Sequence, residues 1–167
     1  MTDQPGATPP TPSPGNIPPE RSAILEALGV LVSEGAYEGS HAMIPDVVLR
    51  GRTTFEWLEG KHFLIQREAI EDSEMPAASI SIIGADDPGA PLVEHYFDSR
   101  GVSRVYGMSF SEGVWSRWRD HPGFSQRSTG TLSDDGKMIT LRSELSRDGV
   151  NWEHEMELTY TRLGADN

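Results

Sequence analysis

The chain has 167 residues, with no Cys, 12 Pro, 17 Gly and a formal net charge of -12. This length allows one domain of ordinary size. Without cysteine there is no disulfide, thiolate zinc site, iron–sulfur cluster or cysteine nucleophile. The excess of 26 Asp and Glu over 14 Lys and Arg argues against a surface for nucleic acid or an anionic membrane, because phosphate groups need a basic patch.

The prolines are concentrated at the N-terminus, where residues 1–19 contain seven of the 12 and a single charged residue, Asp3. Such a segment buries too little apolar surface to offset the loss of chain entropy, so we expect a disordered or polyproline-like tail. A docking peptide for a proline-reading domain is the alternative. The segment has neither the basic start nor the apolar core of a secretory signal, and no stretch approaches the ~20 apolar residues of a membrane helix. We therefore expect a cytoplasmic protein with no membrane segment.

The next segment, 20–32, has the pattern of one short helix. Leu25, Leu28 and Leu31 recur at helical spacing, Ser22 can cap the start, and Gly29 weakens the middle. We expect the leucine face to pack on the rest of a single domain that spans 20–163.

Beyond this helix the chain shows the regular turn signals of a β-meander. Glycine beside Asp, Ser or Pro recurs roughly every dozen residues, as at Gly89, Gly101, Gly123, Gly136 and Gly149. The ten strands predicted between such turns lie near 35–43, 47–57, 62–71, 77–84, 91–98, 102–110, 113–119, 123–132, 137–146 and 151–162.

The connections between these strands are too short for crossover helices, so neighbouring strands must pair antiparallel. A sheet of ten such strands avoids two free edges by closing on itself. We therefore predict a mainly β protein, a ten-stranded antiparallel up-and-down β-barrel with one short N-terminal helix. A two-sheet sandwich is the alternative.

Strand alternation predicts which side chains point into the barrel. In the last strand, His154 shares a face with apolar residues, while Glu153, Glu155 and Glu157 share the other. We therefore expect His154 inside and the three glutamates outside. Tyr106 is expected inside as well. Buried polar groups of this kind need partners, which can be each other, water or a ligand.

Motifs for catalysis and for metal binding are not found. The five histidines show no helical pairing, and the chain has no nucleophile elbow, phosphate loop or calcium loop. Glu144 and Glu56 could be interior carboxylates, but we favour cross-strand ion pairs on the outer face, with Arg142 and Arg52 as neighbours. No catalytic or metal-binding residue is therefore proposed, and a non-enzymatic role is the expectation.

Four segments resemble those of a bacterial family of uncharacterised lipocalin-like proteins, from about Leu25 to Arg162. They are HYFDSRGVSRVY (95–106), GVWSRWRDHPGFSQR (113–127), TGTLSDDGKMI (129–139) and SRDGVNWEHEMELTYTR (146–162). The family consists of small calycin-type barrels, related in shape to fatty-acid-binding proteins and nitrobindins. The resemblance implies a fold and a cavity but no reaction. Nitrobindin-like relatives hold haem on a histidine of the last strands, a position that His154 matches.

These observations lead to three hypotheses. The first is a binding protein with no required cofactor, which holds a small hydrophobic or amphipathic molecule inside the barrel. The second is a haem protein with His154 as the axial ligand. The third is an interaction module that assembles through its outer faces, with a homodimer left open. For the first, the expected ligand-binding residues are Trp57, His95, Tyr106, Trp118, Arg127, Trp152 and His154.

Overall fold

The computed structural model describes residues 23–71, 78–85 and 90–163. The predicted tail, 1–19, lies outside these residues. The described chain begins with a short α-helix and a 3-10 helix and continues as ten strands. The strands are β1 (Ser33–His41), β2 (Leu49–Trp57), β3 (Leu64–Glu71), β4 (Ala78–Ala85), β5 (Leu92–Asp98), β6 (Ser103–Ser111), β7 (Val114–Arg119), β8 (Ser125–Leu132), β9 (Met138–Ser146) and β10 (Glu153–Arg162).

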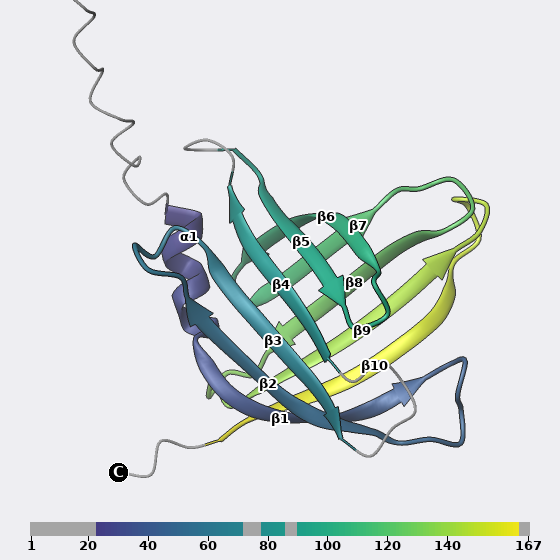
Figure 1. Cartoon of the computed structure of the whole chain (residues 1–167), viewed down its shortest axis with the longest axis horizontal. Helices are drawn as coiled ribbons and strands as arrows, with labels where there is room; N and C mark the ends of the chain where they lie inside the picture. The colour runs from purple at the N-terminus through teal and green to yellow at the C-terminus, as the bar shows by residue number, and fades with distance from the viewer. Residues whose placement is uncertain (1–22, 72–77, 86–89, 164–167) are drawn as a thin grey trace, which may run out of the picture.

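The ten strands form one closed antiparallel barrel (Figure 1). Each strand pairs with its neighbours in the chain, and β1 also pairs with β10, with Tyr37 opposite Tyr160. Because the first and last strands pair, the sheet has no free edge. The prediction of a ten-stranded up-and-down barrel is confirmed, and the sandwich is excluded.

Over its described residues, the predicted helix is only partly α-helical. The α-helix α1 spans Ala23–Ala27, and the 3-10 helix η1 continues it over Leu28–Leu31. Gly29 and the β-branched Val30 disfavour an α-helix here, which is a physical reason for the tighter last turn. Among the described residues, no helix is long and apolar enough to cross a membrane.

The helical segment lies at one end of the barrel (Figure 1) and closes that end with apolar side chains. Leu25, Leu28 and Leu31 are buried in the same cluster as Phe110 and Trp115. This hydrophobic core fills the half of the barrel next to α1. The interior of the other half combines apolar with buried polar side chains, and it contains the cavity described below.

A β-bulge in β10 changes which side chains point inward. The pairing of β10 with β9 shifts between His154 and Met156, so that an extra residue is accommodated in β10. As a result Glu155 is buried and His154 is exposed. The predictions that His154 points inward and Glu155 outward are therefore wrong, since one extra residue reverses the alternation.

The outer face carries cross-strand ion pairs, as predicted for Glu144 and Glu56. Each carboxylate pairs with an arginine of the adjacent strand: Arg127 Nε lies 2.6 Å from Glu144 Oε2, and Arg67 Nε lies 3.1 Å from Glu56 Oε1. Arg142 pairs instead with Glu157. Register decides these partners, because a residue's neighbour across the sheet belongs to another strand.

The buried leucines that close one end of the barrel give a direct test of the fold. Leu28 is fully buried, so Leu28→Ala should lower the free energy of unfolding by about 2–5 kcal/mol through the cavity it leaves. Val30 in the same 3-10 helix is 42% exposed, and Val30→Ala should change stability by only about 0.5 kcal/mol. Urea denaturation of both variants measures their free energies of unfolding. Equal losses of stability would contradict the packing of Leu28 in the end of the barrel.

Candidate functional site

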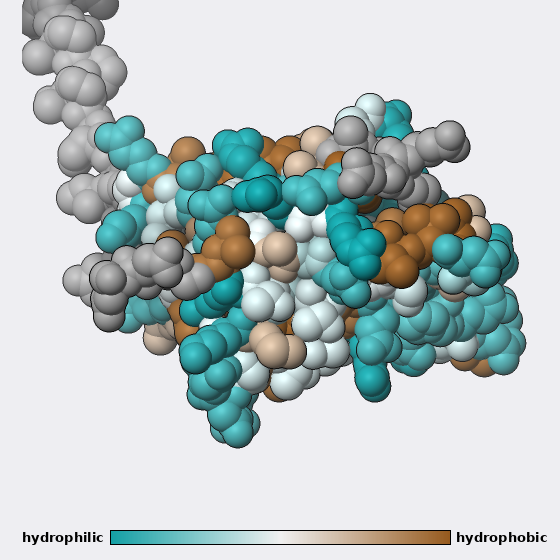
Figure 2. Space-filling view, turned by 90° about the horizontal axis from the view of Figure 1, so that it is seen from below, coloured by the Kyte–Doolittle hydropathy of each residue, from teal (hydrophilic) through white to brown (hydrophobic). Residues whose placement is uncertain are grey.

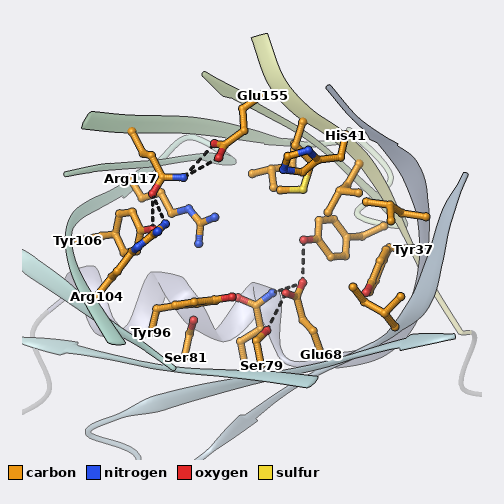
Figure 3. Close-up of a pocket in the computed structure, with 18 of the residues that line it drawn as sticks. Tyr37, His41, Glu68, Ser79, Ser81, Tyr96, Arg104, Tyr106, Arg117 and Glu155 are labelled. Carbon is orange, nitrogen blue, oxygen red and sulfur yellow. Dashed lines mark hydrogen bonds between the residues drawn. The ribbon is translucent and has the colours of Figure 1, made fainter. Parts of the chain in front are cut away.

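A cavity of about 170 Å³ lies inside the barrel. All ten strands contribute to its lining, and many of the contributing residues stand at strand ends far from α1, such as His41 at the end of β1 and Leu49 at the start of β2. Figure 3 shows Arg104, Tyr106 and Arg117 on one side of the cavity and Glu68 and Tyr37 on the other. The cavity therefore has two chemically different walls.

The first wall is anchored by a buried ion pair. Arg117 on β7 reaches Glu94 on β5 with 2.9 Å between Nη1 and Oε1, and the Glu94 side chain is 0% exposed. Ser81 donates to the same oxygen at 2.7 Å, and Arg117 Nε donates to Ser128 at 3.3 Å. Burial opposes the positive charge of Arg117, but the Glu94 carboxylate raises the Arg117 pKa above its ordinary value.

Beside this pair, a relay of hydrogen bonds joins Arg104 to Glu155. Arg104 Nη1 and the Tyr106 hydroxyl both donate to Gln126 Oε1, at 2.7 and 2.8 Å. The amide nitrogen of Gln126 donates to both oxygens of Glu155, at 2.7 and 3.0 Å. The bulge that exposes His154 thus places Glu155 where the Gln126 amide can satisfy it.

The opposite wall holds a carboxyl group with three donors. Tyr160 and Gln66 donate to Glu68 Oε1 at 2.8 and 2.9 Å, and Ser79 donates to Glu68 Oε2 at 3.2 Å. Burial inside the barrel raises the pKa of Glu68, although these hydrogen bonds and Arg117 oppose the shift. Burial and the nearby Glu68 also raise the pKa of the Tyr160 hydroxyl.

The lining is rich in arginine although the protein is acidic. Arg100, Arg104 and Arg117 line the cavity, against two glutamates, Glu68 and Glu155. Arg100 is held at the rim by Asp98, 2.6 Å away, and its hydrogen bonds keep the Asp98 pKa at about 2 although burial opposes this. The lining thus has a formal charge of +1, and the carboxylates that pair with Arg100 and Arg117, Asp98 and Glu94, lie outside the lining.

Some polar atoms around the cavity have no partner among the described residues. The indole nitrogen of Trp115, which lines the cavity, is one of them, and Oε2 of Glu94 behind the lining is another. Buried polar atoms of this kind cost free energy unless water or a ligand satisfies them. The interior therefore has unused hydrogen-bonding capacity.

Of the seven predicted ligand-binding residues, only Tyr106 lines this cavity. Trp57 is half-buried and packs against the hydrophobic core. The remaining five side chains are on the outer face of the barrel. His95 and Trp118 occupy outward positions of β5 and β7, and His154 is turned outward by the bulge.

Arg127 and Trp152 meet on the outer surface. The guanidinium of Arg127 lies 4.1 Å from the ring centroid of Trp152 and pairs with Glu144. Their prediction as pocket residues placed them on the wrong face, although they do contact each other.

The residues of the cavity do not fit haem bound through His154, because that side chain is exposed and outside the lining. The cavity is also smaller than the roughly 300–1,000 Å³ of pockets for drug-sized ligands. His41 is the one histidine among the lining residues, and its Nδ1 accepts a 3.1 Å hydrogen bond from the Met43 amide. Within the described part of the chain, no three His, Asp or Glu side chains cluster as metal ligands.

The expected ligand-binding residues do not include Arg104, Arg117, Glu68 and Gln126, which the structure places around the cavity. A signal for two of them was present: Arg104 alternates in phase with Tyr106, and Arg117 with Trp115. Glu68 has no such signal, because β3 carries charges on both faces.

No protein-family model and no curated protein matches this chain. Among solved structures, it is similar to "Crystal Structure of Rv2717c from M. tuberculosis". The TM-score is 0.60 with 13% sequence identity, covering 87% of this chain and 100% of that chain. This likeness supports the barrel fold. The lipocalin-like family relationship stays a prediction.

The buried ion pair should dominate the stability of the cavity wall. Arg117→Met leaves Glu94 without its countercharge, so the free energy of unfolding should fall by about 3–5 kcal/mol. Combining it with Glu94→Leu should restore most of the loss, since no buried charge remains. The matched control, Arg142→Met, breaks an exposed pair and should cost less than about 1 kcal/mol. Denaturant unfolding of the three variants measures these changes in stability. A double variant that is no more stable than Arg117→Met would contradict the prediction.

Glu68 should make stability depend on pH in a defined direction. Its folded pKa is raised above the ordinary value of 4.5, so the unfolded state releases this proton first as pH rises. The contribution of Glu68 to stability is therefore greatest below pH 4.5 and falls as pH rises through the folded pKa. The stability of Glu68→Gln relative to the natural chain should increase over that window. Denaturant titrations from acid to neutral pH measure it, and a difference independent of pH would contradict a raised pKa.

Proposed function

We propose that this protein is a binding protein for a small anionic molecule with a short apolar part, held inside the barrel. The observation that carries the proposal is the lining by Arg100, Arg104 and Arg117 in a chain of net charge -12. Arginine forms charge-assisted hydrogen bonds with carboxylates, phosphates and sulfonates, often through two nitrogens at once.

The two inner arginines have donors to spare. Among the described residues, Arg104 donates a hydrogen bond through Nη1, and Arg117 donates through Nε and Nη1. Neither has a described hydrogen-bond partner at Nη2. An anion between them would accept from these groups without displacing Glu94 or Gln126.

The volume and the apolar lining set the size of the ligand. Leu49, Ile70, Leu141 and Leu158 line the cavity together with the polar groups, so part of the ligand can be apolar. An engineered apolar cavity of about 150 Å³ holds benzene. The cavity of about 170 Å³ is therefore suited to a molecule with roughly one small ring or a short chain.

Benzoate and its neutral isostere benzamide test this proposal by isothermal titration calorimetry. Benzoate should bind, and benzamide should bind about 10- to 100-fold more weakly, because hydrogen bonds to a charged group add about 1.5–3 kcal/mol. Arg104→Gln should remove most of this preference for the anion.

The control is the same change on the outer face, Arg127→Gln, which should leave benzoate affinity unchanged. Equal losses in both variants would place the binding outside the cavity. Equal affinity for benzoate and benzamide would contradict recognition of an anion.

A further inference from the structure

One wall of the barrel has an uncharged outer surface. The outward positions of β4, β5 and β6 hold no Asp, Glu, Lys or Arg. Their larger residues are Ile80, Ile82, Val93, His95, Phe97 and Val105, and the others are Ala, Ser and Gly. By contrast, the outer faces of β1, β2, β9 and β10 carry ion pairs such as Glu38–Arg50 and Arg142–Glu157. We call the outer face of β4–β6 the apolar wall; β4 and β5 cross the near side of the barrel in Figure 1.

Strand register makes this surface continuous. Ile82 pairs with His95, which pairs with Val105, so these three residues form one row across the three strands. Ile80 pairs with Phe97 in the adjacent row. Because same-face neighbours lie side by side in a sheet, the apolar groups join into one patch.

Two aromatic side chains extend the apolar wall at its flanks. The Trp118 indole lies over Gly107, where an added Cβ would come within 2.6 Å of the ring. Phe63 lies over Gly84 in the same way, at 2.5 Å. Glycine at these two positions lets each ring lie close to the sheet.

The surface remains accessible to solvent. Val105 is 53% exposed, Trp118 is 42% exposed, and Phe97 and Phe63 are each 41% exposed. The largest apolar patches on monomers, of about 300–600 Å², are often functional surfaces. Figure 2, seen from below relative to Figure 1, shows hydrophilic residues over one end of the molecule, with hydrophobic residues beside them.

We propose that the apolar wall is the contact surface between two copies of this chain. A twofold contact brings the wall of one copy against the same wall of the other, so one uncharged surface meets another. Two chains of charge -12 can meet there because no carboxylate of the wall enters the contact. A charged partner would find no countercharge on the wall.

The size of the wall fits a reversible dimer. Each outward residue covers roughly 30 Å², since strands lie ~4.8 Å apart and same-face residues ~6.6 Å apart. The twelve outward positions of the three strands then give about 400 Å² of flat footprint. A standard interface buries about 800 Å² of accessible surface per partner. The wall covers about half of that area, which suits a weak, reversible contact.

Sedimentation equilibrium of the full chain at about 1–200 µM tests the proposal, because it detects a dimer whose dissociation constant lies in that range. The natural chain should show a monomer–dimer equilibrium. Val105→Glu should weaken it at least about tenfold, because two carboxylates would be buried in the contact. The control Thr129→Glu adds the same charge at an exposed position of β8 and should leave the equilibrium almost unchanged.

Salt gives an independent readout, since it screens repulsion between two acidic chains while leaving an apolar contact intact. Dimerisation should therefore strengthen when NaCl is raised from about 50 to about 500 mM. Circular dichroism and thermal melting check that Val105→Glu is folded, and Val105→Ser provides a milder variant that should also weaken the dimer.

Three results would overturn the proposal. One is a monomer at all concentrations and salt levels. Another is a dimer that Val105→Glu and Val105→Ser do not affect. The third is a monomer that binds phosphatidylcholine vesicles through Val105, which would make the wall a lipid-binding surface.

Discussion

The ion pair between Glu94 and Arg117 is the interaction on which the polar half of the barrel depends. Glu94 is completely buried, and a lone carboxylate there would be strongly destabilising. Through this pair and its hydrogen bonds, β4, β5, β7 and β8 are tied together by Ser81, Glu94, Arg117 and Ser128. Arg117 also lies with its guanidinium carbon 5.0 Å from the ring centroid of Tyr106, so the same side chain orders the adjacent lining.

A closed barrel must fill its interior, and this chain fills the two halves in different ways. Leucines of the helical segment and the aromatic residues Phe55, Phe110 and Trp115 pack one half as an ordinary core. Around the cavity, apolar side chains such as Leu49 and Leu158 are joined by charged and hydroxyl-bearing ones, which hydrogen-bond to one another across the barrel. Since these side chains are held by paired contacts, the space left between them is a preformed cavity, which favours binding without rearrangement.

The outer surface is divided in a comparable way. Ion pairs cover the walls formed by β1, β2, β9 and β10, and they keep those faces hydrated. The β4–β6 wall lacks charges, so the two proposed roles, ligand binding inside and self-association outside, use different faces of the same strands. In β5, for instance, Glu94 and Tyr96 point inward while His95 and Phe97 point outward. One alternating strand thus contributes to both.

Much of the architecture could be predicted because it rests on local signals. Glycines in turns, such as Gly101 and Gly136 with positive φ, marked where strands end, and the short connections required antiparallel pairing. Tyr106 was correctly placed inside from its apolar neighbours. The candidate site was predicted poorly, because histidine and tryptophan were favoured as pocket residues and the arginines on the same inward faces were not.

The amino-acid sequence by itself determined the number of strands, their order and the leucine face of the helix, since these follow from spacing along the chain. Only the tertiary structure decided which polar residues meet. The bulge between His154 and Met156 has no local sequence signal, yet it moves Glu155 inside and His154 outside. The pairs Glu94–Arg117 and Tyr160–Glu68 join strands distant in the chain, so their partners depend on closure and register, which are properties of the whole barrel.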